Sequence, residues 1–169
     1  MTATETPRLP FYRLAPGIHG PLLALTRAAT KGLDRSLVEL LLIRASQLNH
    51  CAFCLDMHVT DARKAGETDE RIALLGAWEE ATGLYSPKER AALALTEAVT
   101  LLTDGFVPDE VYDRAAAHFE DADLVRLIAL ITAINSWNRI NVAARIPVGA
   151  SLAPAEAVPA EAAPAGGAS

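Results

Sequence analysis

The stretch ELLLIRASQLNHCAFCLDMH, residues 39–58, joins an apolar run to two closely spaced cysteines. Its apolar residues recur at spacings of three and four, which is the period of an α-helix that packs on other helices. We therefore expect one helix beginning at residue 34 or 36 and ending near residue 48, and a second over residues 50–64. Asn49 suits the N-cap of the second helix because its side chain accepts hydrogen bonds from backbone N–H groups of the first turn.

Helical geometry places the reactive residues of the second helix on one face. At about 100° per residue, Cys51, Cys54 and His58 fall within an arc of about 60°. The apolar residues on the same stripe are Leu55, Ala62 and Ala65. This face is therefore expected to point into the protein or into a subunit interface rather than into water.

Cys51 and Cys54 form a C-x-x-C motif and are the only two cysteines of the chain. In a compartment that keeps thiols reduced, such a pair is more often redox-active or metal-binding than a structural bridge. Positions three apart on a helix have Cα atoms about 5 to 5.5 Å apart, and a disulfide tolerates about 4.4 to 6.8 Å. Reversible bridging is therefore feasible, and the nearby helix N-terminus would stabilise a thiolate.

His58 and Glu39 are candidate proton carriers. His58 follows Cys54 by one helical turn, which suits a reaction in which a thiolate attacks and an acid protonates the leaving oxygen. Glu39 interrupts an apolar helix, and a carboxyl group in that setting is suited to passing protons near neutrality. Each residue also has an ordinary structural interpretation: Glu39 fits the capping box Ser36-x-x-Glu39, and His58 fits a core histidine bonded to a carbonyl.

Other polar and aromatic residues have weaker claims to a role. His50 lies about 100° around the helix from Cys51 and is as consistent with the surface as with the site. His19 and His118 have no partner that the sequence identifies. The segment NSWNR, residues 135–139, is a polar patch in an apolar helix, and its Trp137 and Arg139 are candidates for a pocket or an oligomer contact, although packing explains them as well.

The remainder of the chain predicts an all-α fold of about seven helices, since no segment alternates with period two. The other expected helices cover residues 21–30, 68–78, 87–102, a short segment from residue 108, and residues 121 or 123 to 144. Residues 1–20 are dense in proline and glycine and predict an extended N-terminal arm lying on a helical domain of residues 21–147. Residues 148–169 are rich in alanine and proline and predict a disordered tail.

Composition excludes several classes of partner. The formal net charge of −6 and the absence of a basic cluster argue against nucleic acid. The apolar stretches fall short of the roughly 20 residues that a membrane span needs, and the first residues show no secretory signal. We therefore expect a cytoplasmic protein.

The spacing E-x11-C-x2-C-x3-H, formed by Glu39, Cys51, Cys54 and His58, resembles the core motif of the alkylhydroperoxidase D (AhpD) family, part of the carboxymuconolactone decarboxylase superfamily. The helical order over residues 20–146 and the segment INSWNRI are also similar to that family. The resemblance implies an all-α domain that assembles into trimers or hexamers. It also implies an oxidoreductase, a thiol-dependent peroxidase of antioxidant defence that needs no cofactor or metal.

The same resemblance assigns roles to the four residues. Cys54 would be the nucleophile that a small hydroperoxide oxidises, Cys51 the resolving thiol, and Glu39 with His58 the proton relay. A thiol or dithiol would be the electron donor. Two observations disagree with this assignment: Cys51 lies nearer the helix N-terminus, and Phe53 stands where the best-studied pattern has a further histidine.

Three alternatives remain open at this point. Cys51, Cys54 and His58 are a suitable zinc set, with Glu39 or His50 as fourth ligand. A redox-sensing oligomer would cycle the disulfide without peroxidase turnover. A lyase of the carboxymuconolactone decarboxylase kind shares the fold, but that branch lacks the cysteine pair.

Overall fold

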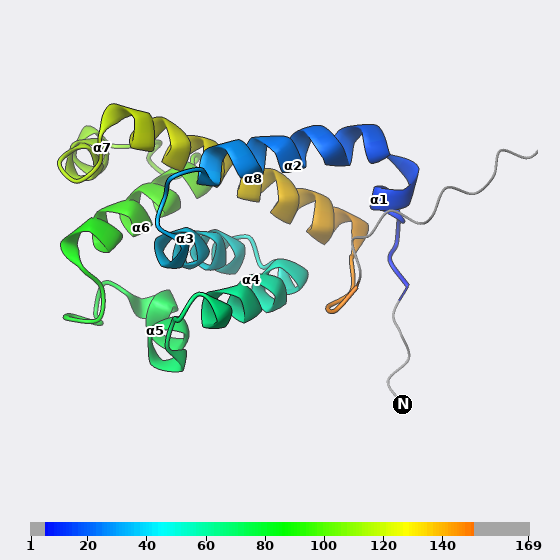
Figure 1. The fold of residues 1–169 in the computed structure, drawn as a ribbon, viewed down its shortest axis with the longest axis horizontal. Coiled ribbons are helices and arrows are strands. Elements are labelled where there is room, and N and C mark those ends of the chain that lie inside the picture. Colours follow the sequence, from blue (N-terminus) through cyan, green and yellow to red (C-terminus); the bar gives the residue numbers. More distant parts are fainter. Residues whose placement is uncertain (1–5, 151–169) are drawn as a thin grey trace, which may run out of the picture.

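The computed structural model describes residues 6–150, and within them every regular element is a helix (Figure 1). The elements are α1 (Phe11–Leu14), α2 (Pro16–Thr30), α3 (Arg35–Leu48), α4 (Ala52–Lys64), α5 (Asp69–Leu74), the 3₁₀ helix η1 (Leu75–Ala77), α6 (Pro87–Thr100), α7 (Asp109–Ala116) and α8 (Asp121–Ala144). The expected all-α class is confirmed, and α1 is an element that the sequence did not predict. None of these helices is long and apolar enough to cross a membrane.

Helix α3 lies at the centre of the bundle and packs against α4, α6 and α8 (Figure 1). Nine of its residues are buried, including the continuous run Leu37–Ile43. A helix that is apolar on all sides has to be enclosed by other helices, because no face of it is suited to water. The position of α3 therefore follows from its sequence, and it carries Glu39 into the interior.

The prediction of an extended backbone up to residue 20 was wrong for residues 11–14, which form α1, and for residues 16–20. Helix α2 begins at Pro16, which occupies the first turn, where a missing N–H costs nothing. Pro21 lies inside the helix and cannot bond to the carbonyl of Gly17, but Gly17 is exposed and water can satisfy that group. Residues 151–169 of the expected tail and residues 1–5 of the expected arm lie outside the described residues.

The turn from α3 to α4 takes only three residues. The N–H of Cys51 bonds to the carbonyl of Ser46 at 3.0 Å, and the N–H of His50 bonds to that of Gln47 at 3.2 Å. These two bonds form a Schellman motif, which needs a left-handed residue at its C′ position. His50 takes that position with φ +55°, whereas the end of α4 uses Gly66 at φ +97° for the same purpose.

The expected capping of α4 by Asn49 was therefore wrong. Asn49 is the C-cap of α3, and the N-cap of α4 is Cys51, whose sulfur accepts a hydrogen bond from the backbone N–H of Cys54. The helix begins at Ala52 instead of residue 50. Sequence patterns missed this because the Schellman motif usually shows a glycine, and His50 is an uncommon occupant.

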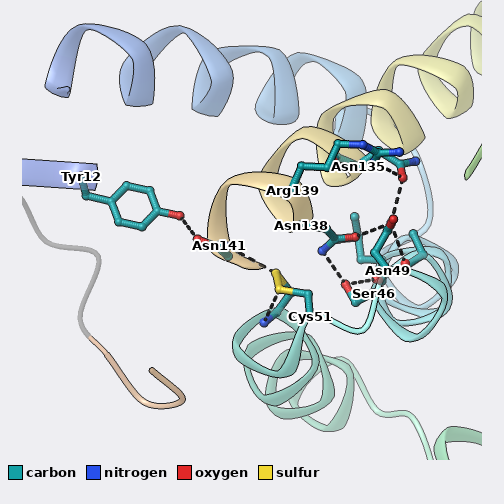
Figure 2. Close-up of a disulfide and its surroundings, with 11 residues drawn as sticks. Tyr12, Ser46, Asn49, Cys51, Asn135, Asn138, Arg139 and Asn141 are labelled. Atoms are coloured by element: carbon teal, nitrogen blue, oxygen red, sulfur yellow. Dashed lines mark hydrogen bonds between the residues drawn. A yellow bond between two sulfur atoms is a disulfide. The ribbon is translucent and has the colours of Figure 1, made fainter. Parts of the chain in front are cut away.

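Asparagine side chains on α8 connect this turn to α8 by hydrogen bonds (Figure 2). The side-chain amide of Asn49 donates to the Oδ1 atoms of Asn135 at 2.8 Å and Asn138 at 3.0 Å. Asn138 in turn donates to the hydroxyl of Ser46 at 3.1 Å and is completely buried. The polar patch on α8 that the sequence singled out is thus largely a structural network.

We expect Asn138→Ala to lower the free energy of unfolding by about 2–3 kcal/mol, because it removes two buried hydrogen bonds, one from Asn49 and one to Ser46. Ser136→Ala on the same helix is the matched control, since Ser136 bonds only to the carbonyl of Thr132 near the surface. It should change the free energy by less than about 0.5 kcal/mol. Urea unfolding followed by circular dichroism measures both, and equal effects would contradict the network.

Two substitutions of His50 test whether the left-handed backbone at this position limits which residues the turn tolerates. Glycine tolerates the left-handed conformation, so His50→Gly should leave the free energy of unfolding within about 0.5 kcal/mol of the unsubstituted protein. Valine, which is β-branched, should lower it by about 2 kcal/mol. Thermal and urea unfolding of the two variants test this, and similar stabilities for both would show that the turn imposes no left-handed constraint.

Candidate functional site

Cys51 and Cys54 are joined as a disulfide at the start of α4, with their Cα atoms 5.3 Å apart. Both residues are buried, at 1% and 0% exposure. Phe53 packs with them, and Ile146 and Ala150 cover this cluster from the segment after α8. The geometry confirms that the spacing permits a bridge, and the surrounding apolar side chains keep bulk water from it.

Glu39 and His58 form a buried pair between α3 and α4. Glu39 Oε2 lies 3.0 Å from His58 Nδ1, and each residue is only 9% exposed. The capping-box interpretation of Glu39 is wrong, because Asp34 is the N-cap of α3 and the hydroxyl of Ser36 bonds to Glu67 instead. The core-histidine interpretation of His58 also fails in its detail, since the partner is a carboxylate rather than a carbonyl.

This pairing settles which nitrogen of His58 is available for chemistry. The Nδ1–H donates to the carboxylate of Glu39, so Nε2 is the ring atom left to take or give a proton. A carboxylate on the far nitrogen also fixes the orientation of the ring. The pair therefore has the arrangement of an imidazole oriented by a carboxylate.

A cavity of about 150 Å³ lies beside the pair and the disulfide. Cys54 and His58 both line it, whereas Cys51 does not. The other lining residues are Tyr12, His19, Leu23, Thr26, Leu42, Phe53, Met57, Ile134, Trp137 and Asn141. Because most of these side chains are apolar, the cavity suits a small organic molecule with one polar end directed at Cys54.

An aromatic cluster from distant parts of the chain forms one wall of the cavity. The ring of His19 lies 5.2 Å from that of Tyr12 and 5.5 Å from that of Trp137, centroid to centroid. Trp137 also donates to the hydroxyl of Thr26 at 3.0 Å. The pocket role considered for Trp137 is confirmed, whereas Tyr12 and His19 were missed. The one available signal was the presence of aromatic residues in the proline-rich arm.

Asn141 links this wall to the disulfide (Figure 2). Its Nδ2 donates to Cys54 Sγ at 3.3 Å, and its Oδ1 accepts a hydrogen bond from the hydroxyl of Tyr12. Burial raises the pKa of Tyr12 to about 12, and the bond to Asn141 opposes this only in part. Tyr12 therefore keeps its proton near neutral pH and acts as the donor. No sequence motif indicated Asn141.

The remaining candidates lie apart from the cavity. His50 and His118 are exposed, and Arg139 bonds to the carbonyl and side chain of Asn135. The zinc alternative has little geometric support, because no three His, Cys, Asp or Glu side chains within residues 6–150 are arranged to bind a metal.

Comparison with known proteins places the chain in a family. The sequence pattern of the carboxymuconolactone decarboxylase family matches residues 21–98. The uncharacterized protein YdfG of Bacillus subtilis is 44% identical over 137 residues, which is 80% of this chain and 92% of YdfG. The uncharacterized Escherichia coli protein YnjA is 33% identical over 141 residues, covering 83% of this chain and 74% of YnjA.

A solved structure agrees with these sequence matches. A protein of unknown function from Agrobacterium tumefaciens, described as an AhpD antioxidant-defence candidate, superimposes with a TM-score of 0.81 at 34% identity. The match covers 86% of this chain and all of that one. This chain therefore belongs to the carboxymuconolactone decarboxylase superfamily as an AhpD-like member.

Proposed function

We propose that this protein is a thiol-dependent peroxidase that reduces hydroperoxides through a Cys51–Cys54 dithiol/disulfide cycle. The observation that carries the proposal is that Cys54, bonded to Cys51, lines the same apolar cavity as a histidine paired with Glu39. A nucleophile, its resolving thiol and a proton carrier are thereby brought together at a space that can admit a small organic molecule.

The cycle balances in three steps. The Cys54 thiolate attacks the terminal oxygen of the hydroperoxide, the O–O bond breaks, and the alkoxide leaves as an alcohol with the proton from His58. Cys54 is then a sulfenic acid, and the sulfur of the Cys51 thiol attacks it to form the disulfide, while the thiol proton and the sulfenic hydroxyl leave together as water. A thiol or dithiol donor finally supplies two electrons and two protons to restore both thiols.

Cys54 is the better candidate for the nucleophile on the geometry of the cavity. It lines the cavity and accepts a hydrogen bond from Asn141, whereas Cys51 lies behind it as the helix N-cap. Cys51 also has support for a thiolate, since the N–H of Cys54 donates to its sulfur at 3.3 Å. Access for the substrate decides between the two, because a sulfur that the peroxide cannot reach is not oxidised first.

The biological setting proposed with this activity is antioxidant defence in the cytoplasm, where thiol donors are maintained in reduced form. We also propose that the chain forms a homo-oligomer, a trimer or hexamer. Exposed apolar side chains on α2 and α8, among them Leu25, Val125 and Val142, support this proposal because they suit contact with other copies. Sedimentation velocity measures the assembly directly.

The first experiment uses mass spectrometry of the reduced, metal-free protein after one equivalent of cumene hydroperoxide. The unsubstituted protein should lose two hydrogen atoms as the disulfide forms. Cys51→Ser should retain a sulfenic acid on Cys54 that dimedone traps, and Cys54→Ser should form none at a comparable rate.

Each other outcome of that experiment supports a different interpretation of the two cysteines. Trapping of a sulfenic acid in Cys54→Ser alone would exchange the roles of the two cysteines. If the unsubstituted protein keeps both thiols, the peroxidase proposal is wrong. Stoichiometric zinc and blocked thiols would then support the metal alternative, and disulfide exchange without peroxide would support a redox sensor.

Glu39→Gln tests the proton relay. Losing the carboxylate that orients His58 should slow formation of the Cys54 sulfenic acid about a hundredfold in a single turnover. Glu97→Gln is the control, since Glu97 pairs with Arg44 and Trp78 away from the cavity. Stopped-flow fluorescence measures both rates, and equal rates would remove Glu39 from the mechanism.

A further inference from the structure

A continuous hydrogen-bond chain joins the N-terminal segment to the sulfur of Cys54. The hydroxyl of Tyr12 on α1 donates to Oδ1 of Asn141 on α8, and Nδ2 of Asn141 donates to Cys54 Sγ at 3.3 Å (Figure 2). These residues come from three helices, and Tyr12 and Asn141 are 129 positions apart in the sequence. Cys54 therefore receives a directed N–H group whose orientation depends on a distant tyrosine.

Further hydrogen bonds attach the N-terminal segment to the end of α8, next to the hydrogen-bond chain through Asn141. The N–H of Leu9 bonds to the carbonyl of Ala144 at 3.3 Å, and the guanidinium of Arg8 bonds to that of Ala143 at 3.5 Å. On the other side, the carbonyl of Asn141 accepts the N–H of Ile146 at 3.0 Å. Helix α1 is thus held against the last turns of α8, which brings Tyr12 within reach of Asn141.

The carboxamide of Asn141 has two possible orientations, and only one helps a thiolate. With Nδ2 toward the sulfur it supplies a hydrogen-bond donor, and with Oδ1 toward the sulfur it places two electron-rich atoms together. The hydroxyl of Tyr12 can bond to either end of the amide, and the bond that it makes is the one to Oδ1, which holds the first orientation. The bond to sulfur should also strengthen on reduction, since hydrogen bonds to a charged acceptor are stronger than those to a neutral one.

We propose that Tyr12 is a positioning residue that holds the Asn141 amide in the orientation that stabilises the Cys54 thiolate. Helix α1 thereby controls how readily Cys54 ionises, and Asn141 transmits the effect. That this orientation speeds peroxide reduction rests on the proposed function, whereas its effect on the ionisation of Cys54 does not. The two statements can therefore fail separately.

Other titratable groups also act on Cys54 and must be held constant. Cys51 adjoins it in the disulfide, His58 lies one turn further along α4, and His19 lines the cavity from α2. Glu39 reaches the site from α3 through His58. Replacing Tyr12 by phenylalanine leaves all of these in place and removes one hydroxyl, so a change in the titration of Cys54 reports on that hydroxyl.

The test measures the rate of Cys54 alkylation by iodoacetamide as a function of pH, in full-length protein carrying Cys51→Ser so that one thiol remains. Tyr12→Phe should move the midpoint of the profile to higher pH and lower the rate near neutral pH about tenfold, the size expected for one charge-assisted hydrogen bond. Asn141→Ala should produce an equal or larger change, because it removes the donor itself.

Two controls make the result specific. Tyr85→Phe also removes a tyrosine hydrogen bond, the one to the carbonyl of Arg71, and it should leave the profile unchanged. Tyr12→Phe added to Asn141→Ala should have no further effect, because Tyr12 acts through Asn141. Circular dichroism checks that each variant is folded.

The proposal is overturned if Tyr12→Phe shifts the profile no more than Tyr85→Phe does, or if its shift persists in the Asn141→Ala background. Neither result depends on peroxide. A shifted profile in a protein that does not reduce cumene hydroperoxide would sustain the positioning role of Tyr12 and refute the proposed function. An unshifted profile in a protein that does reduce cumene hydroperoxide would refute the positioning role of Tyr12 and sustain the proposed function.

Discussion

The site depends on the Schellman motif that ends α3, because that motif decides where Cys51 stands. Its two hydrogen bonds, from Cys51 to Ser46 and from His50 to Gln47, reverse the chain within three residues. Cys51 therefore closes one helix and caps the next, and its sulfur faces the backbone N–H of Cys54. The same reversal packs α4 against α3 and allows Glu39 to meet His58.

The Glu39–His58 pair is hard to explain by stability alone. Transferring a carboxylate from water into an apolar interior is costly, and a single ion pair or hydrogen bond repays that cost only in part. Well-packed apolar residues of similar size would serve the α3–α4 contact equally well or better. What a carboxylate and an imidazole add, beside a cavity that also contains Cys54, is the capacity to move a proton.

Much of the fold could be predicted from local sequence patterns, whereas the cavity wall that contains Tyr12 and Asn141 could not. Helical periodicity located α3, α6 and α8, and α6 begins with a full capping box formed by Ser86 and Glu89. The spacing of Glu39 and His58 from the two cysteines predicted that these four residues belong to one site. Asn49 was wrongly predicted as the N-cap of α4, because the left-handed residue that follows it is His50 and not the glycine that usually marks the end of a helix. Tyr12 and Asn141 meet only through long-range packing, which no local pattern encodes.

The cavity is assembled from two sources. Residues 21–98, where the family pattern matches, supply Cys54, His58 and part of the apolar lining. Tyr12, His19, Trp137 and Asn141 come from outside that range. A relative recognised only over the matched region can therefore share the positions of Cys54 and His58 without sharing the opposite wall. The molecule that such a protein accepts therefore depends on residues near both ends of the chain, which the family match does not cover.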